Sequence, residues 1–108
     1  RRGIEHDLIA WSRERSMPIM AYSPIEQGRL ARSSELADIA RAHGATPAQI
    51  ALAWVLDKPG IVAIPKTSRP ERVEENLKAL DIRLTDDDRT RLDQAFPPPR
   101  GKTGLEMI

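Results

Sequence analysis

Cysteine is absent from this chain of 108 residues, which excludes a disulfide framework and thiol chemistry and is consistent with a reducing cytoplasm. Long hydrophobic runs are also absent, and none approaches the roughly 20 residues that a membrane-spanning helix needs. Neither charge is in excess: 17 basic and 16 acidic residues leave a net charge of +1, which gives no argument for a nucleic-acid or membrane partner. We therefore expect a cytoplasmic protein with neither of these partners.

The patterns that are present alternate between helix and strand, which is typical of an α/β protein with a parallel sheet. Two strands are expected, at residues 18–23 and 61–64, and Pro24 and Pro65 end them. The second strand contains no polar residue, which suits a strand that is buried on both faces.

Five helices are predicted from apolar spacing and cap residues. The first runs to about residue 15 and should bury a stripe of Ile4, Leu8 and Trp11. The next helix begins at Ser33 or Ser34 and ends at Gly44. Glycine suits a left-handed C′ position because it tolerates a positive φ. The buried residues expected in the later helices are Leu36, Ile39, Ala40, Leu92 and Phe96.

Three further helix starts are visible. Thr46, Pro47 and Gln49 form a capping box with a first-turn proline, and this helix should run to about residue 56. Another helix opens at Pro70, and the last opens at Thr85 with an acidic first turn. Residues 97–108 follow as an irregular tail.

The turn after the second strand is strongly cationic. Residues 66–69 (KTSR) form a strand-to-helix loop, and Pro70 suits a first helical position because its missing N–H would be unpaired there. An anion at this turn would meet the helix dipole and the side chains of Lys66, Arg69 and Arg72. The alternative is a solvated helix start whose basic side chains form ordinary ion pairs with the glutamates that follow.

The order I-P-K-T-S-R-P-E-R-V-E-E-N-L at residues 64–77 resembles the cofactor-binding segment after the last barrel strand of the aldo-keto reductase family. This resemblance implies NADPH, with its adenosine 2′-phosphate at Lys66, Thr67 and Arg72 and its adenine near Glu75 and Asn76. Helical spacing places Arg72, Glu75 and Asn76 on one face, and Val73, Leu77 and Leu80 form a separate apolar stripe.

One residue of this segment departs from the family pattern. Arg69 precedes Pro70 where a small hydroxyl cap would be more familiar. Either the cap shifts to Ser68 with Glu71 completing its box, or Arg69 adds a third cation to the phosphate site.

The turn after the first strand, YSPIEQG at residues 22–28, resembles the seventh-strand loop of the same family. The resemblance implies that Tyr22 stacks on the nicotinamide ring and that Ser23, Ile25 and Gln27 lie along the pyrophosphate. The alternative for Tyr22 is an aromatic side chain that simply covers the barrel mouth. The candidate cofactor-binding residues are Tyr22, Ser23, Pro24, Ile25, Gln27, Gly28, Lys66, Thr67, Ser68, Arg72, Glu75 and Asn76.

The chain is too short for the whole (β/α)8 TIM barrel of that family, which needs roughly 250 residues. It also starts at Arg1 without an initiating methionine or a signal peptide. We therefore expect residues 1–108 to be a C-terminal fragment that contains the last two βα units and flanking helices. Such a fragment would need the rest of the barrel or self-association, because a two-stranded parallel sheet leaves its edges open.

The parent protein that the resemblance implies is an NADPH-dependent aldo-keto reductase that reduces small carbonyl substrates to alcohols. The family's catalytic tyrosine, aspartate, lysine and histidine have no matching positions in this chain, so no catalytic residue is assigned and the fragment alone should be inactive. A metal site is not expected either. His6 should face solvent, and His43 is explained by the dipole at a helix C-terminus.

Parts of the sequence also match two other functions. Residues 35–56 have the outline of a DNA-binding helix-turn-helix, but the second helix contains only Gln49 as a polar side chain and no Lys or Arg. A free-standing anion- or nucleotide-binding module of two βα units is the other alternative.

Overall fold

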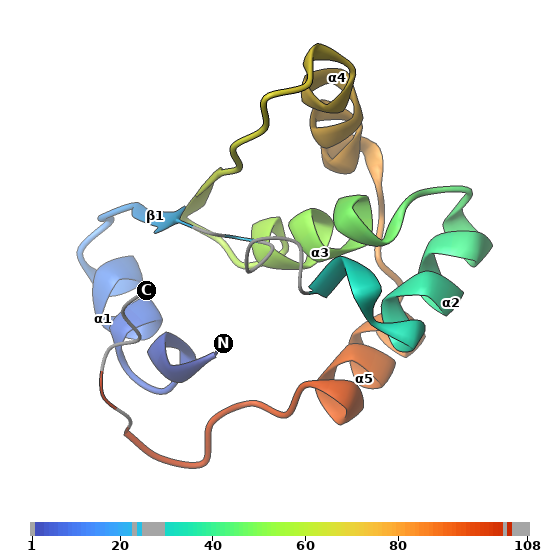
Figure 1. Ribbon diagram of the computed structural model, residues 1–108. Helices are drawn as coiled ribbons and strands as arrows, with labels where there is room; N and C mark the ends of the chain where they lie inside the picture. Colours follow the sequence, from blue (N-terminus) through green and yellow to red (C-terminus); the bar gives the residue numbers. More distant parts are fainter. Residues whose placement is uncertain (1, 23, 25–29, 103, 105–108) are drawn as a thin grey trace.

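The computed structural model describes residues 2–22, 24, 30–102 and 104 (Figure 1). Short 3-10 helices alternate with α-helices and two strands. In chain order the elements are η1 (Gly3–Glu5), α1 (Leu8–Glu14), β1 (Ile19–Tyr22), η3 (Leu30–Arg32), α2 (Ser34–His43), α3 (Pro47–Leu56), β2 (Ile61–Ile64), α4 (Pro70–Lys78), η4 (Ala79–Asp81) and α5 (Asp86–Ala95).

The two strands form a parallel pair, as the alternating pattern predicted. Ile19 lies opposite Ile61 and Tyr22 lies opposite Ile64, and the chain between the strands contains α2 and α3. The prediction that β2 is buried on both faces is wrong for the described residues, because Val62 is 47% and Ile64 43% exposed. Alternate side chains of a strand point to opposite faces, and α3 packs on β2 from one side only.

The hydrophobic core lies among α2, α3 and α5, which gather together in Figure 1. Leu36, Ile39 and Ala40 of α2 and Leu92 of α5 are buried, as expected. Phe96 is only partly buried, but it packs against this core and its ring centroid lies 5.8 Å from that of Trp54.

Local caps set the helix boundaries as the sequence predicted. Ser33 is the N-cap of α2, and Gly44 ends it with a φ of 62°. Such a left-handed conformation costs a residue with a Cβ about 1 kcal/mol or more, so glycine suits this position. Thr46 with Gln49 and Thr85 with Asp88 form complete capping boxes at α3 and α5.

The buried stripe expected in the first helix is wrong. Leu8 is 37% and Trp11 46% exposed, whereas Ile9 and Ser12 are buried. The segment is not one continuous helix, because η1 ends at Glu5 and α1 begins at Leu8. Within α1, the buried face carries Ile9 and Ser12, and the face of Leu8 and Trp11 has no covering element among the described residues.

Candidate functional site

The two turns singled out in the sequence leave the same edge of the sheet. Tyr22, the last residue of β1, pairs in register with Ile64, the last residue of β2. The strands run parallel, so the segments that follow them start side by side. In α/β proteins ligands bind at this carboxyl edge of the strands.

The turn after β2 leads into α4 without a side-chain cap. Arg69 is the N-cap residue, and its side chain makes no capping hydrogen bond. The alternative in which Ser68 caps the helix is therefore wrong. The hydroxyl of Thr67 instead accepts a hydrogen bond from the N–H of Arg69, at 3.1 Å. This local bond orders the loop and leaves the positive end of the α4 dipole uncovered by any side chain.

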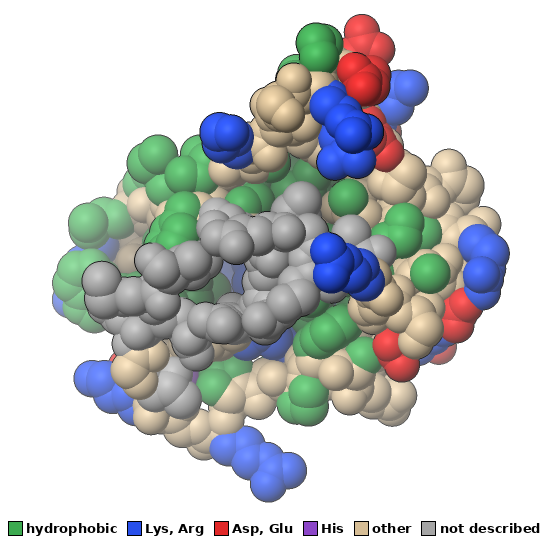
Figure 2. Space-filling model, viewed as in Figure 1, with side chains coloured by type: hydrophobic (Ala, Val, Ile, Leu, Met, Phe, Trp, Pro, Cys, Tyr) green, Lys and Arg blue, Asp and Glu red, His purple; other side chains and the backbone are tan. Residues whose placement is uncertain are grey.

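Three cations surround this helix start. Lys66, Arg69 and Arg72 are exposed, and none of them forms an ion pair with another residue that the structure describes. Basic and acidic side chains lie over α4 at the top of the molecule in Figure 2, yet the ordinary ion pairs of the alternative interpretation do not form. The cations are thus available to an anion at the turn.

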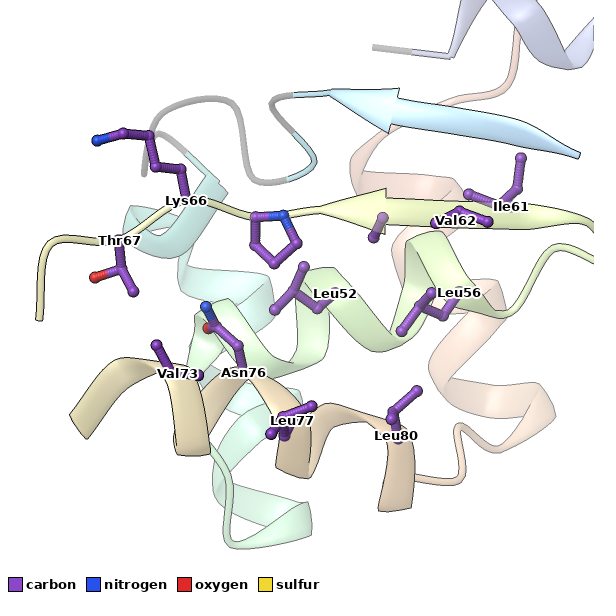
Figure 3. A pocket seen from close by; sticks show the side chains of 12 residues that line it. Leu52, Leu56, Ile61, Val62, Lys66, Thr67, Val73, Asn76, Leu77 and Leu80 are labelled. Carbon is purple, nitrogen blue, oxygen red and sulfur yellow. The ribbon is translucent and has the colours of Figure 1, made fainter. Parts of the chain in front are cut away.

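An apolar groove of about 570 Å³ separates α4 from β2 and α3 (Figure 3). Lys66 and Thr67 lie at one end of it, and Asn76 points into it from α4. Asn76 therefore shares a face with Val73, three residues earlier, as well as belonging to the predicted polar face. The lining residues are Leu52, Leu56, Ile61, Val62, Ala63, Pro65, Lys66, Thr67, Val73, Asn76, Leu77 and Leu80.

The apolar stripe that runs along α4 into η4 exists but is not packed. Val73 is 51% exposed and Leu77 and Leu80 are each 61% exposed, and α4 buries no residue. The expectation that this face packs is wrong within the described residues, because β2 and α3 lie across the groove and do not close it.

The first turn is described only in part. Tyr22 is 55% exposed, and Pro24 is buried. The predicted residues Ser23, Ile25, Gln27 and Gly28 lie outside the described residues. In the second turn, Ser68 is exposed, whereas Thr67, Glu75 and Asn76 are partly buried.

Sequence reasoning missed the partner of His43. Its Nε2 lies 2.6 Å from Oδ2 of Asp88, so the last residue of α2 is tied to the first turn of α5. Burial acts to raise the pKa of Asp88, but hydrogen bonds from the Thr85 N–H and from His43 outweigh it and hold that pKa below its usual value. Asp88 also occupies the N3 position of the capping box of α5. This position was the sequence signal that Asp88 has a structural role at the helix start.

His6 is exposed, as predicted. The described residues contain no group of three His or carboxylate side chains that could hold a metal ion. Within the same residues, no helix is both long and apolar enough to span a bilayer.

Helix α3 cannot serve as the recognition helix of a helix-turn-helix. Its residues 49–53 are all buried, and α2, β2 and α4 contact it. A recognition helix must present its side chains to base edges, which this helix has no free face to do.

Comparison with known sequences gives a consistent result. A sequence model of the Aldo/keto reductase family matches residues 1–96. Methylglyoxal reductase YeaE of Escherichia coli strain K12 is 42% identical over 112 residues, which cover 99% of this chain and 39% of that protein. The uncharacterized oxidoreductase YtbE of Bacillus subtilis strain 168 is 38% identical over 89 residues, which cover 82% of this chain and 31% of that protein. The chain thus spans at most about two fifths of these relatives.

Solved structures agree with the sequence comparison. An aldo/keto reductase from Klebsiella pneumoniae in complex with NADP and acetate has a TM-score of 0.96 at 44% identity, covering 100% of this chain and 40% of that one. An aldo-keto reductase from the same organism in complex with NADPH has a TM-score of 0.95 at 46% identity, covering 99% and 39%. Because the family model matches most of its length and its fold superposes on these reductases, this chain belongs to the aldo/keto reductase family.

Proposed function

We propose that this chain is the cofactor-binding C-terminal part of an NADPH-dependent aldo-keto reductase that reduces carbonyl compounds to alcohols. It would supply the last two βα units of the barrel. The observation that carries the proposal is the group of three exposed cations, without ion pairs to the described residues, at the uncapped start of α4. Two solved relatives were crystallised with NADP or NADPH, which supports the same cofactor here.

The residues present suit the adenosine end of NADPH. Lys66 and Arg72 would bind the 2′-phosphate with the hydroxyl of Thr67, and Ser68 and Arg69 lie in the same loop. Glu75 and Asn76, which are partly buried on α4, would lie near the adenine. The hydroxyl of Thr67 accepts from the Arg69 N–H, so its own O–H is left to donate to a phosphate oxygen.

The nicotinamide end would lie at the neighbouring turn. Tyr22 is at the end of β1, beside the start of the phosphate loop, and its ring would stack on the nicotinamide. Ser23, Ile25 and Gln27 would lie along the pyrophosphate, and Pro24 and Gly28 are cofactor-binding candidates in the same turn. NADPH supplies the hydride when bound, and this chain's part is to hold and orient it.

The proton donor would come from the rest of the protein. The family resemblance places the catalytic tyrosine, aspartate, lysine and histidine in segments that this chain does not match, so the chain alone should be inactive. Relatives named as methylglyoxal reductases support a small carbonyl compound as the substrate class.

The test is a titration of the full-length protein with NADPH and with NADH, comparing Arg72→Ala with the unsubstituted protein. A hydrogen bond to a charged group contributes about 1.5 to 3 kcal/mol. The Kd for NADPH should therefore rise roughly 10- to 100-fold, and the Kd for NADH should change far less, because NADH lacks the 2′-phosphate.

Lys78→Ala is the matched control. It removes the same charge from the same helix at the exposed far end, and it should leave both affinities nearly unchanged. Equal losses for the two cofactors in Arg72→Ala, or an equal effect of Lys78→Ala, would show that Arg72 does not bind the 2′-phosphate.

A further inference from the structure

The side chain of Gln49 joins two helices that are far apart in the sequence. It is buried, with 7% of its surface exposed. Its Oε1 accepts a hydrogen bond from the N–H of Thr46 at 2.9 Å, which closes the capping box of α3. Its Nε2 donates to the carbonyl of Glu75 in α4 at 2.8 Å. One amide group therefore serves both the start of α3 and the middle of α4.

The two partners determine which way the amide is oriented. A backbone N–H only donates and a carbonyl only accepts, so Oε1 must face Thr46 and Nε2 must face Glu75. A capping box accepts either Glu or Gln at this position. Of these two residues, only Gln also provides an N–H donor for the Glu75 carbonyl. The contact with α4, and not the cap of α3, therefore explains why residue 49 is Gln and not Glu.

The carbonyl of Glu75 is open to this bond because α4 changes its winding there. The N–H of Ala79, which would bond to Glu75 in a continuing α-helix, instead bonds to Asn76 as the chain enters the 3-10 helix η4. The tighter turn leaves the Glu75 carbonyl to accept from Gln49.

Helix α4 has few other attachments. It buries no residue, and its apolar stripe faces the groove. Among the described residues, apart from the backbone bonds to η4, which continues it, no other hydrogen bond and no ion pair joins α4 to another helix or strand. The buried Ala79 of η4 packs the C-terminal end of α4 near α3, and the Gln49 amide fixes the turn that carries Glu75 and Asn76 by a directed bond.

We propose that Gln49 is a positioning residue of the cofactor site, which holds α4 so that Arg72, one turn before Glu75, meets the 2′-phosphate of NADPH. The inference rests on the proposed function. Gln49 itself does not touch the cofactor, and it acts through the backbone of α4.

The test compares Gln49→Glu with the unsubstituted full-length protein. The substitution keeps the capping acceptor, removes the donor and sets a carboxylate against the Glu75 carbonyl. The Kd for NADPH should rise about 3- to 10-fold, as expected for the loss of one hydrogen bond, and kcat at saturating NADPH should stay unchanged. The preference for NADPH over NADH should fall with it. If the protein does not fold with Glu there, Gln49→Met removes the donor without adding charge.

Thr46→Ala is the matched control, because it weakens the cap of α3 and leaves the bond to α4 in place. It should lower the Tm and leave the Kd for NADPH within about twofold. In an Arg72→Ala background, Gln49→Glu should no longer change the NADPH preference.

Three results would overturn the inference: an unchanged Kd in Gln49→Glu, an equal rise in Thr46→Ala, or a full effect of Gln49→Glu in the Arg72→Ala background. Failure of the unsubstituted protein to bind NADPH is a different outcome. It would refute the proposed function, and the positioning role with it.

Discussion

Asp88 holds two helices together through one carboxylate oxygen. Its Oδ2 accepts from the Thr85 N–H at 3.0 Å, inside the capping box of α5, and lies 2.6 Å from Nε2 of His43 at the end of α2. Because a carboxylate oxygen only accepts, Nε2 of His43 must carry the proton. The side chain of Asp88 is 9% exposed and that of His43 is 20% exposed, so water does not easily replace the bond between them.

The cost of removing this carboxylate follows from these contacts. Asp88→Ala deletes the capping acceptor, worth about 1 kcal/mol, and a hydrogen bond to a charged group, worth about 1.5 to 3 kcal/mol. We expect the full-length protein to lose about 2.5 to 4 kcal/mol of its free energy of unfolding at pH 7. Asp88→Asn keeps an oxygen acceptor and loses only the charge, so about 1 kcal/mol is expected. Urea unfolding followed by circular dichroism measures both.

The dependence on pH gives a second measurement. The folded-state pKa of Asp88 is lowered, so its carboxylate stabilises the fold above the pKa of the unfolded chain. That stabilisation is lost as the pH falls through the folded-state pKa. The advantage of the unsubstituted protein over Asp88→Asn should therefore be complete at pH 7 and should disappear progressively below about pH 4.

Asp87→Asn separates the specific bonds from the helix dipole. Asp87 lies in the same turn and is exposed, and its side chain has no hydrogen bond to another described residue. It should cost no more than a few tenths of a kcal/mol. The reasoning fails if Asp87→Asn and Asp88→Asn are equally destabilising, or if the Asp88→Asn difference is the same at pH 3 and pH 7.

Two further predictions concern the core and the open sheet. Leu92→Ala should lower the free energy of unfolding of the full-length protein by about 2 to 5 kcal/mol, because Leu92 is fully buried. A decrease below about 1 kcal/mol, measured by chemical denaturation, would contradict this prediction. The isolated 108-residue chain should self-associate or stay partly molten, because Met20 is 66% and Val62 47% exposed on strands with open edges. Sedimentation that shows a compact 12.1 kDa monomer with cooperative unfolding would refute that prediction.

Features that depend on neighbouring residues in the chain could be predicted. The Thr46 capping box, the glycine that ends α2 and the two strands ended by prolines all appear near their expected positions. Caps and turns depend on side chains that reach the backbone two or three residues away, so their signals are contained in a short segment. The cationic turn before α4 belongs to this group, since its basic residues and the helix start are contiguous.

Burial was harder to predict, because a periodic pattern shows which face is apolar but not what covers it. The stripe of α4 has the correct spacing and lies open to a groove, and α1 buries Ile9 and Ser12 instead of the expected Leu8 and Trp11. Both outcomes depend on where other elements lie.

By itself the sequence determined the order of helices and strands, the caps, and the cationic turn whose residue order identifies the family. Only the tertiary structure brought Tyr22 beside Ile64, His43 to Asp88 and Gln49 to Glu75. These pairs are separated by 26 or more residues, and no local rule chooses between the partners available at that distance. The packing of α2 against α5 and of α3 against β2 and α4 makes that choice, because it determines which groups lie within hydrogen-bonding reach of each other.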